Sequence, residues 1–174
     1  MPFATQPAPV RILGVDTSLR STGVGVVAAE GNSLAAVWHG RIRNPPDRPL
    51  SDCLLSLAEG LAGIIAEHHP EAVALEGVFY AKNLRTTLIL GQARGAVIAQ
   101  CARSGVPVFE YEPRRVKQAV VGYGNAGKEQ MQRMVMSLLG LREIPQEDAA
   151  DALALAICHH HNRTRLKLLD IRPL

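Results

Sequence analysis

The chain has 174 residues, of which 47% are hydrophobic and 20% are charged. This composition excludes a wholly disordered chain, and the length suffices for one globular domain that needs no disulfide bonds. The net charge of +3 permits an anionic partner without requiring one, and an aromatic content of 4% is low for a protein that stacks on nucleic-acid bases.

The first half of the chain predicts three strands, a helix and a fourth strand. Residues 1–10 contain three prolines and predict a disordered lead. Apolar runs separated by turn residues, among them the hairpin signal Gly31-Asn32, predict antiparallel strands at residues 11–16, 24–29 and 34–42. Residues 50–68 have the apolar spacing of a helix. Residues 72–76 form a short apolar run that ends in an acid, which predicts the fourth strand.

The second half of the chain is mostly helical in pattern. A helix rich in small residues, a fifth strand and three more helices are expected at residues 84–103, 106–111, 113–121, 128–140 and 146–161, before a tail at 162–174. The small residues of the first of these helices suit either a dimer contact or packing on the chain's own sheet. The order of elements predicts a single α/β domain over residues 11–161, with a five-stranded mixed sheet flanked by helices.

Four acidic residues occupy positions where a carboxylate is unexpected. Asp16 and Glu76 each end an apolar strand, and Asp148 and Asp151 lie three residues apart on one face of an otherwise apolar helix. Converging carboxylates repel one another unless cations lie between them, and Mg²⁺ prefers oxygen ligands. The pattern therefore predicts a metal site, in which two ions would serve phosphodiester cleavage. A turn-forming role for Asp16 and a helix-dipole role for Asp148 are the alternatives.

Several blocks of the sequence carry a resemblance to one enzyme family. Two of them are specific, Phe-Tyr-Ala-Lys-Asn at 79–83 and Gly-Gln-Ala-Arg-Gly at 91–95, and the others lie at residues 12–16, 20–25, 108–111, 116–122, 127–130 and 147–154. In this order and spacing the chain resembles the RuvC family of Holliday-junction resolvases. One departure is Asp16-Thr17-Ser18, where the family usually has Asp-Pro-Gly. This makes Thr17 and Ser18 candidates for an additional oxygen near the metals.

The resemblance implies a ribonuclease-H-like fold and a homodimer that binds a four-way DNA junction, together with a branch-migration motor, in recombination and repair. Each subunit would nick one strand, leaving 5′-phosphate and 3′-hydroxyl ends. The family would use two Mg²⁺ ions, with Mn²⁺ as a substitute. Matched residue by residue, the metal ligands and catalytic carboxylates correspond to Asp16, Glu76, Asp148 and Asp151. The active-site lysines correspond to Lys117 and Lys128, and a base-stacking aromatic corresponds to Phe79.

The positive charge of the chain lies in its second half, where residues 111–142 hold six basic against two acidic side chains. A local basic patch of this kind favours a polyanion such as DNA. The candidate DNA-contacting residues are Phe79, Tyr80, Lys82, Arg85, Arg114, Arg115, Lys117 and Lys128. A core position for Phe79 and ordinary solvated positions for Arg114 and Arg115 are the alternatives.

Two rival functions share parts of this pattern. An actin-like or sugar-kinase-like ATP-binding domain also begins with a strand, an Asp and a Thr/Ser/Gly turn, and a junction-binding protein without cleavage would also be basic.

Three cysteines without a Cys-x-x-Cys pair indicate buried thiols in a reducing compartment. With neither a signal-peptide pattern nor an apolar run long enough for a membrane span, we expect a cytoplasmic protein that contacts no membrane.

Overall fold

The structure, a computed structural model, describes residues 8–77, 83–168 and 172–174. Its centre is a five-stranded mixed sheet in the order β3-β2-β1-β4-β5. The bounds of the strands are β1 (Val10–Asp16), β2 (Ser21–Glu30), β3 (Ser33–Arg43), β4 (Ala72–Glu76) and β5 (Val108–Tyr111). β1, β2 and β3 are antiparallel to one another, whereas β4 and β5 run parallel to β1. The predicted fold class is confirmed.

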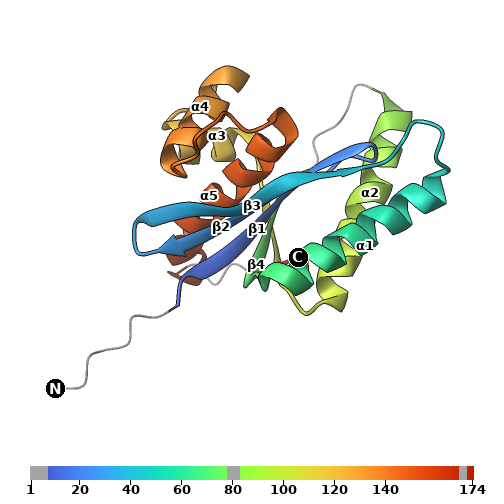
Figure 1. Cartoon of the computed structure of the whole chain (residues 1–174), viewed down its shortest axis with the longest axis horizontal. Helices are drawn as coiled ribbons and strands as arrows, with labels where there is room; N and C mark the ends of the chain where they lie inside the picture. The colour runs from blue at the N-terminus through green and yellow to red at the C-terminus, as the bar shows by residue number, and fades with distance from the viewer. Residues whose placement is uncertain (1–7, 78–82, 169–171) are drawn as a thin grey trace.

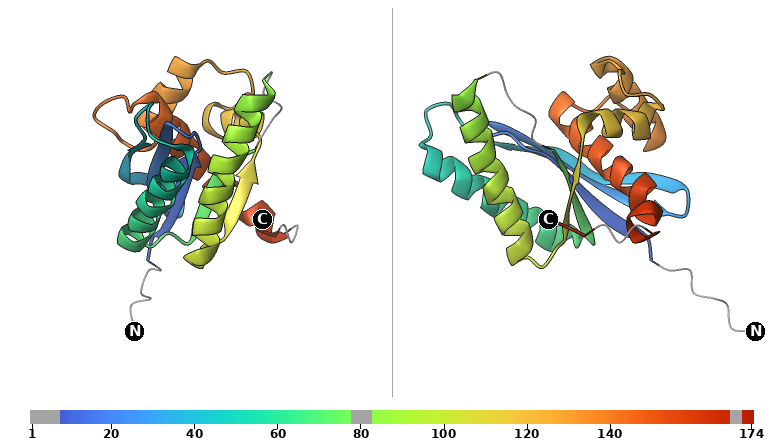
Figure 2. Two further views of the ribbon diagram at one scale, coloured as in Figure 1. Left: turned by 90° about the vertical axis from the view of Figure 1, so that its right-hand side faces the viewer. Right: turned by 180° about the vertical axis from the view of Figure 1, so that it is seen from behind.

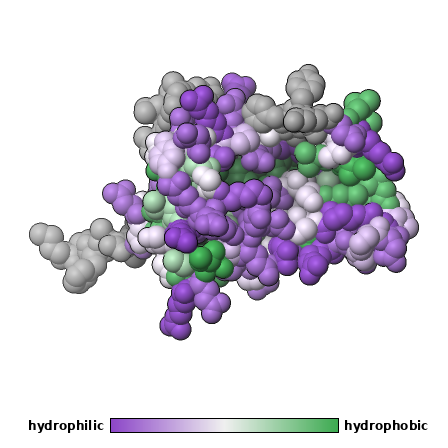
Figure 3. Space-filling view, turned by 90° about the horizontal axis from the view of Figure 1, so that it is seen from above, coloured by the Kyte–Doolittle hydropathy of each residue, from purple (hydrophilic) through white to green (hydrophobic). Residues whose placement is uncertain are grey.

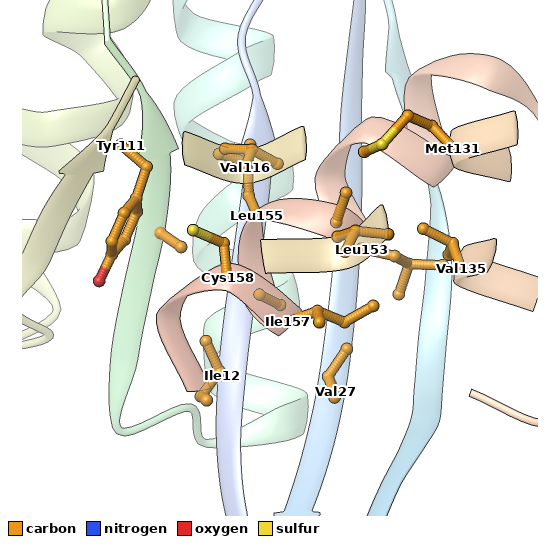
Figure 4. Close-up of a cluster of buried hydrophobic side chains, with 14 of the residues drawn as sticks. Ile12, Val27, Tyr111, Val116, Met131, Val135, Leu153, Leu155, Ile157 and Cys158 are labelled. Atoms are coloured by element: carbon orange, nitrogen blue, oxygen red, sulfur yellow. The ribbon is translucent and has the colours of Figure 1, made fainter. Parts of the chain in front are cut away.

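Helices cover both faces of the sheet (Figures 1 and 2). One face packs against α1 (Leu50–His68) and α2 (Leu84–Arg103), and the other packs against α3 (Pro113–Val121), α4 (Lys128–Leu138) and α5 (Glu147–Leu168). Each face has its own apolar cluster, and Figure 4 shows the one beneath α5. The cysteines are all buried and free, as expected.

Two elements are longer than their sequence patterns indicate. β2 starts at Ser21 because its polar first residues still pair with both neighbouring strands, Gly23 with Asp16 of β1 and Ser21 with Arg43 of β3. α5 continues to Leu168, beyond the expected end at 161. Beyond it, the amide of Leu174 donates a hydrogen bond to the carbonyl of Val108 on the edge strand β5.

Glycines let α5 lie directly on the middle of the sheet. A Cβ at Gly14 of β1 would stand 1.7 Å from the carbonyl oxygen of Ala152, and a Cβ at Gly23 of β2 would stand 1.9 Å from that of Asp148. Neither space admits a methyl group, so the backbone of the helix touches the backbone of the strands. This contact fixes the start of α5 beside the end of β1, where the acidic residues lie.

Candidate active site

The predicted acids come together at one edge of the sheet. Asp16 is the last residue of β1 and Glu76 the last residue of β4, and these parallel neighbours pair up to Val15 and Leu75. The carboxyl ends of parallel strands meet at the same edge, so both acids emerge side by side. The first turns of α5 add Asp148 and Asp151.

A pocket of about 260 Å³ opens between these elements. Three of the acids line it together with both predicted lysines, the set being Asp16, Glu76, Asp151, Lys117 and Lys128. Apolar side chains from α3, α4 and α5 form the rest of its wall. The structure thus gathers residues that lie more than a hundred positions apart in the sequence into a single cavity.

The pocket carries more negative charge than its lysines offset. Burial and then the neighbouring carboxylates, Asp151 foremost, together raise the pKa of Asp16 to about 7. The pKa of Glu76 and that of Asp151 are also raised, chiefly by burial and then by other acids, although Lys117 opposes the shift in both. Acids that lose solvation and repel one another are stabilised when a cation joins them.

Asp148 differs from the other three acids in having partners. The Ser21 hydroxyl donates a hydrogen bond to Oδ2 of Asp148, and Nη1 of Arg41 lies 3.7 Å from the same oxygen. Within the described part of the chain, the carboxylates of Asp16, Glu76 and Asp151 accept no hydrogen bond and form no ion pair. Neither Ser21 nor Arg41 was predicted as a site residue, because only the pairing of β2 with β3 brings them to α5.

Glu147 is a third residue that the sequence pattern did not assign to the site. It is the first residue of α5 and forms an ion pair with Lys128, the first residue of α4. The hydrogen bond to Glu147 raises the pKa of Lys128, and Glu147 in turn raises the pKa of Asp151. The Lys128 side chain is 78% exposed, so it can move from this partner toward a bound substrate.

Arg94 supports the Glu76 side of the site. Its guanidinium donates to the backbone carbonyl of Glu76 and forms an ion pair of 2.9 Å with Glu110 of β5. Thr17 shares a second cavity of about 190 Å³ with Asp16, Glu76 and Arg94, and its hydroxyl is buried without a hydrogen-bond partner among the described residues. Thr17 therefore remains a candidate for an additional oxygen ligand. Ser18 instead bonds within the turn, where its Oγ accepts from the amide of Ser21.

The donor set fits a hard divalent cation. The acids offer only oxygen atoms, and most of those oxygens are not used by protein donors. As the side chains stand, no three His, Cys, Asp or Glu residues of the described ranges are close enough together to hold an ion. Binding would therefore require side-chain rotation about backbone positions that the sheet and α5 already fix.

The predicted DNA-contacting residues fall into three groups. Phe79, Tyr80 and Lys82 lie outside the described residues. Arg85, in the first turn of α2, and Arg114 on α3 are exposed. Arg115 is half-buried, where its guanidinium donates to Asn162 of α5 and lies 6.0 Å from the centre of the Tyr111 ring. These contacts give Arg115 a part in holding α3 against α5 and β5.

Comparison with known proteins identifies relatives over most of the chain. Residues 12–159 match the family model of crossover junction endodeoxyribonuclease RuvC. The crossover junction endodeoxyribonuclease RuvC of Trichlorobacter lovleyi is 51% identical, and the match covers 86% of this chain and 84% of that protein. The crossover junction endodeoxyribonuclease RuvC of Paraburkholderia phytofirmans is 50% identical, and the match covers 92% of this chain and 88% of that protein. The structure of Thermus thermophilus RuvC in complex with Holliday junction substrate superposes with a TM-score of 0.86 at 31% identity, covering 95% of this chain and 99% of that one. Separately, no helix of the described residues is long and apolar enough to span a membrane.

Proposed function

The chain belongs to the RuvC family of crossover junction endodeoxyribonucleases, and we propose that the acidic pocket at the edge of its sheet is where it cuts DNA. The enzyme resolves four-way (Holliday) junctions by paired nicks that leave 5′-phosphate and 3′-hydroxyl ends, in recombination and repair. The main support for the location is the pocket that joins Asp16, Glu76 and Asp151 to two lysines.

The four carboxylates are proposed to hold two Mg²⁺ ions, for which Mn²⁺ can substitute. When bound, such ions activate a water molecule and stabilise the leaving oxygen of the phosphodiester. Asp148 accepts a hydrogen bond from Ser21 at Oδ2 and is proposed to bind the metal through its other oxygen. Asp16 is the acid whose charge is most destabilised by its surroundings, so it gains most from a cation.

The lysines are proposed to stabilise the charge that develops on the phosphate in the transition state. Lys117 enters the pocket from α3 beside Glu76. Lys128 would exchange Glu147 for the phosphate, a change that its exposed position permits. A lysine ammonium suits this role because it is a compact charge on a flexible stem.

The DNA surface is proposed to extend from the pocket across the exposed bases Arg85 and Arg114. Phe79, with Tyr80 and Lys82 beside it, follows Glu76 closely in the chain, which supports a position next to the cleaved strand. Base stacking on an aromatic side chain is worth about 1–3 kcal/mol, so one residue of this kind offsets part of the cost of unstacking a base at the junction.

A homodimer is proposed through the α1–α2 side of the molecule. Leu84 and Leu88 of α2 are 76% and 60% exposed, and Leu55 of α1 is 58% exposed. Figure 3 shows a hydrophobic area at the α1–α2 end of a mostly hydrophilic surface. Gly91 and Gly95 of α2 are also exposed with open space around them, which allows a second helix to approach closely.

Two wider assignments rest on the family alone. A branch-migration motor is the proposed partner, because a nuclease that cuts junctions acts where such motors move them. The cytoplasm is the proposed location, because the curated relatives are bacterial proteins whose names describe an action on DNA crossovers.

The deciding experiment is cleavage of a synthetic four-way junction with and without Mg²⁺, using a linear duplex of the same sequence as the control substrate. We expect paired, symmetric nicks in the junction alone, and none from Asp148→Asn, which should still bind the junction. A wild-type protein that binds but does not cut would support the non-cleaving alternative. Normal cutting by Asp148→Asn would refute the assignment of that acid.

A further inference from the structure

The edge strand β3 carries a row of nitrogen-bearing side chains on the face of the sheet that α5 covers. Arg41 pairs with Gly23 of β2 and His39 pairs with Gly25, and the missing Cβ atoms of both glycines point at α5. Directly paired residues of antiparallel strands point to the same face, and residues two apart along a strand share it. His39, Arg41 and Arg43 therefore lie in line on the α5 side.

The guanidinium of Arg41 stands beside the active site without being used by it. Its Nη1 lies 3.7 Å from Oδ2 of Asp148, which is longer than a hydrogen bond, and that oxygen already accepts from Ser21. Within the described ranges, the Arg41 side chain donates no hydrogen bond, although it is only 27% exposed. An arginine has five donors in a planar fork, so a half-buried one with none engaged is available to a ligand.

A groove of about 570 Å³ adjoins this position and shares no lining residue with the acidic pocket. It runs between β3 and the segment that joins α4 to α5, and its lining includes His39, the oppositely charged neighbours Arg142 and Glu143, and the exposed Ile144. Gly40 and Ala149 also line it, and they are the chain neighbours of Arg41 and Asp148. The groove therefore lies next to the Arg41–Asp148 contact, at the edge strand of the sheet.

We propose that this groove receives the backbone of the cleaved strand beyond the scissile bond, and that Arg41, which lies beside the groove, binds a phosphate of that strand. The proposal rests on the junction-cutting function given above and adds a binding site to it. A guanidinium matches the geometry of a phosphate with two parallel hydrogen bonds, which a lysine at this position would not provide. Arg41 is only 27% exposed and lies near Asp148 before DNA binds, so its side chain is already partly confined and loses less entropy when the phosphate binds.

The test is the salt dependence of junction binding, measured in EDTA so that nothing is cut. Each phosphate contact contributes about 0.7–0.9 to the slope of log K against log salt concentration. We expect Arg41→Gln to reduce the steepness of the slope by about that amount. The ratio of its Kd to the wild-type Kd should therefore fall about 3-fold between 50 and 200 mM salt. Arg103→Gln, at the exposed end of α2, removes the same charge far from the site and should leave the slope at the wild-type value.

Ser21→Ala separates phosphate binding from an indirect effect through Asp148. It removes the hydrogen bond to Asp148 while keeping the Arg41 charge, and we expect a wild-type salt slope from it. An unchanged slope in Arg41→Gln, or an equal change in Ser21→Ala or Arg103→Gln, would overturn the proposal. Failure of the wild-type protein to bind junctions at all would instead refute the proposed function.

Discussion

Replacing Gly23 by alanine tests whether the contact between β2 and α5 positions the acids. The new Cβ would lie 1.9 Å from the carbonyl oxygen of Asp148, whereas real Cβ contacts do not fall below about 3.0 Å, so the strand and helix must separate by about 1.1 Å. The neighbouring atom is backbone in a buried helix, and no side chain can rotate to make room. Overpacking of this kind costs about 1–3 kcal/mol.

The displacement should reduce cleavage far more than it reduces binding. A misplacement of about 1 Å in an active site can lower the rate by about 100-fold, and Asp148 lies at the point of contact. Junction affinity in EDTA should stay within a few-fold, because the exposed basic residues are on other elements. Thermal unfolding should shift downward by roughly 2–4 °C for each kcal/mol lost in a chain of this size.

Gly63→Ala is the matched control. Gly63 is exposed in α1 with no atom within 4 Å of an added Cβ, so alanine should raise stability by about 0.5–1 kcal/mol and leave cleavage unchanged. If Gly23→Ala melts and cuts like the wild-type protein, then the glycine contact does not set the position of Asp148 and the reasoning is wrong.

Three further predictions follow from the charges. Burial lowers the pKa of His159 to about 4 in the fold, while its Nδ1 bonds to Tyr111, so the stability that this group contributes is full above pH 6.5 and falls by about 3 kcal/mol as the pH drops toward 4. The free energy of unfolding of the wild-type protein minus that of His159→Gln, from urea unfolding, should fall by this amount across the range, and a constant difference would contradict the assignment. The acids of the pocket, whose raised pKa values change stability in the opposite direction, are common to both proteins. Mg²⁺ should raise the melting temperature of the wild-type protein at pH 8, and Asp16→Asn should abolish that rise, since the acid most destabilised by burial gains most from a cation. Lys128→Ala should slow single-turnover cleavage by more than 100-fold while junction affinity falls only a few-fold, and equal losses would make it a phosphate anchor instead.

The residues that meet in the acidic pocket could be singled out from the sequence because their signals are local. An acid that ends an apolar strand, as Asp16 and Glu76 do, is visible in a few residues, and the spacing of Asp148 and Asp151 places both on one helix face. The strands and helices were predictable for the same reason, since their apolar periods are short. The start of β2 at Ser21 was missed because a Ser-Thr-Gly run has no such period, and its strand conformation comes from pairing on both sides.

The sequence alone determined the α/β class, the family resemblance and the acids and lysines that form the pocket, because each depends on residue types and spacings along one stretch of chain. Only the tertiary structure decided that Asp148 is held by Ser21 while Arg41 remains available, that Lys128 meets Glu147, and that Arg115 packs against Asn162. Those contacts depend on the register of β3 on β2 and on the approach of α5 to Gly14 and Gly23. Both are set by the packing of segments distant in the chain, which no local pattern encodes.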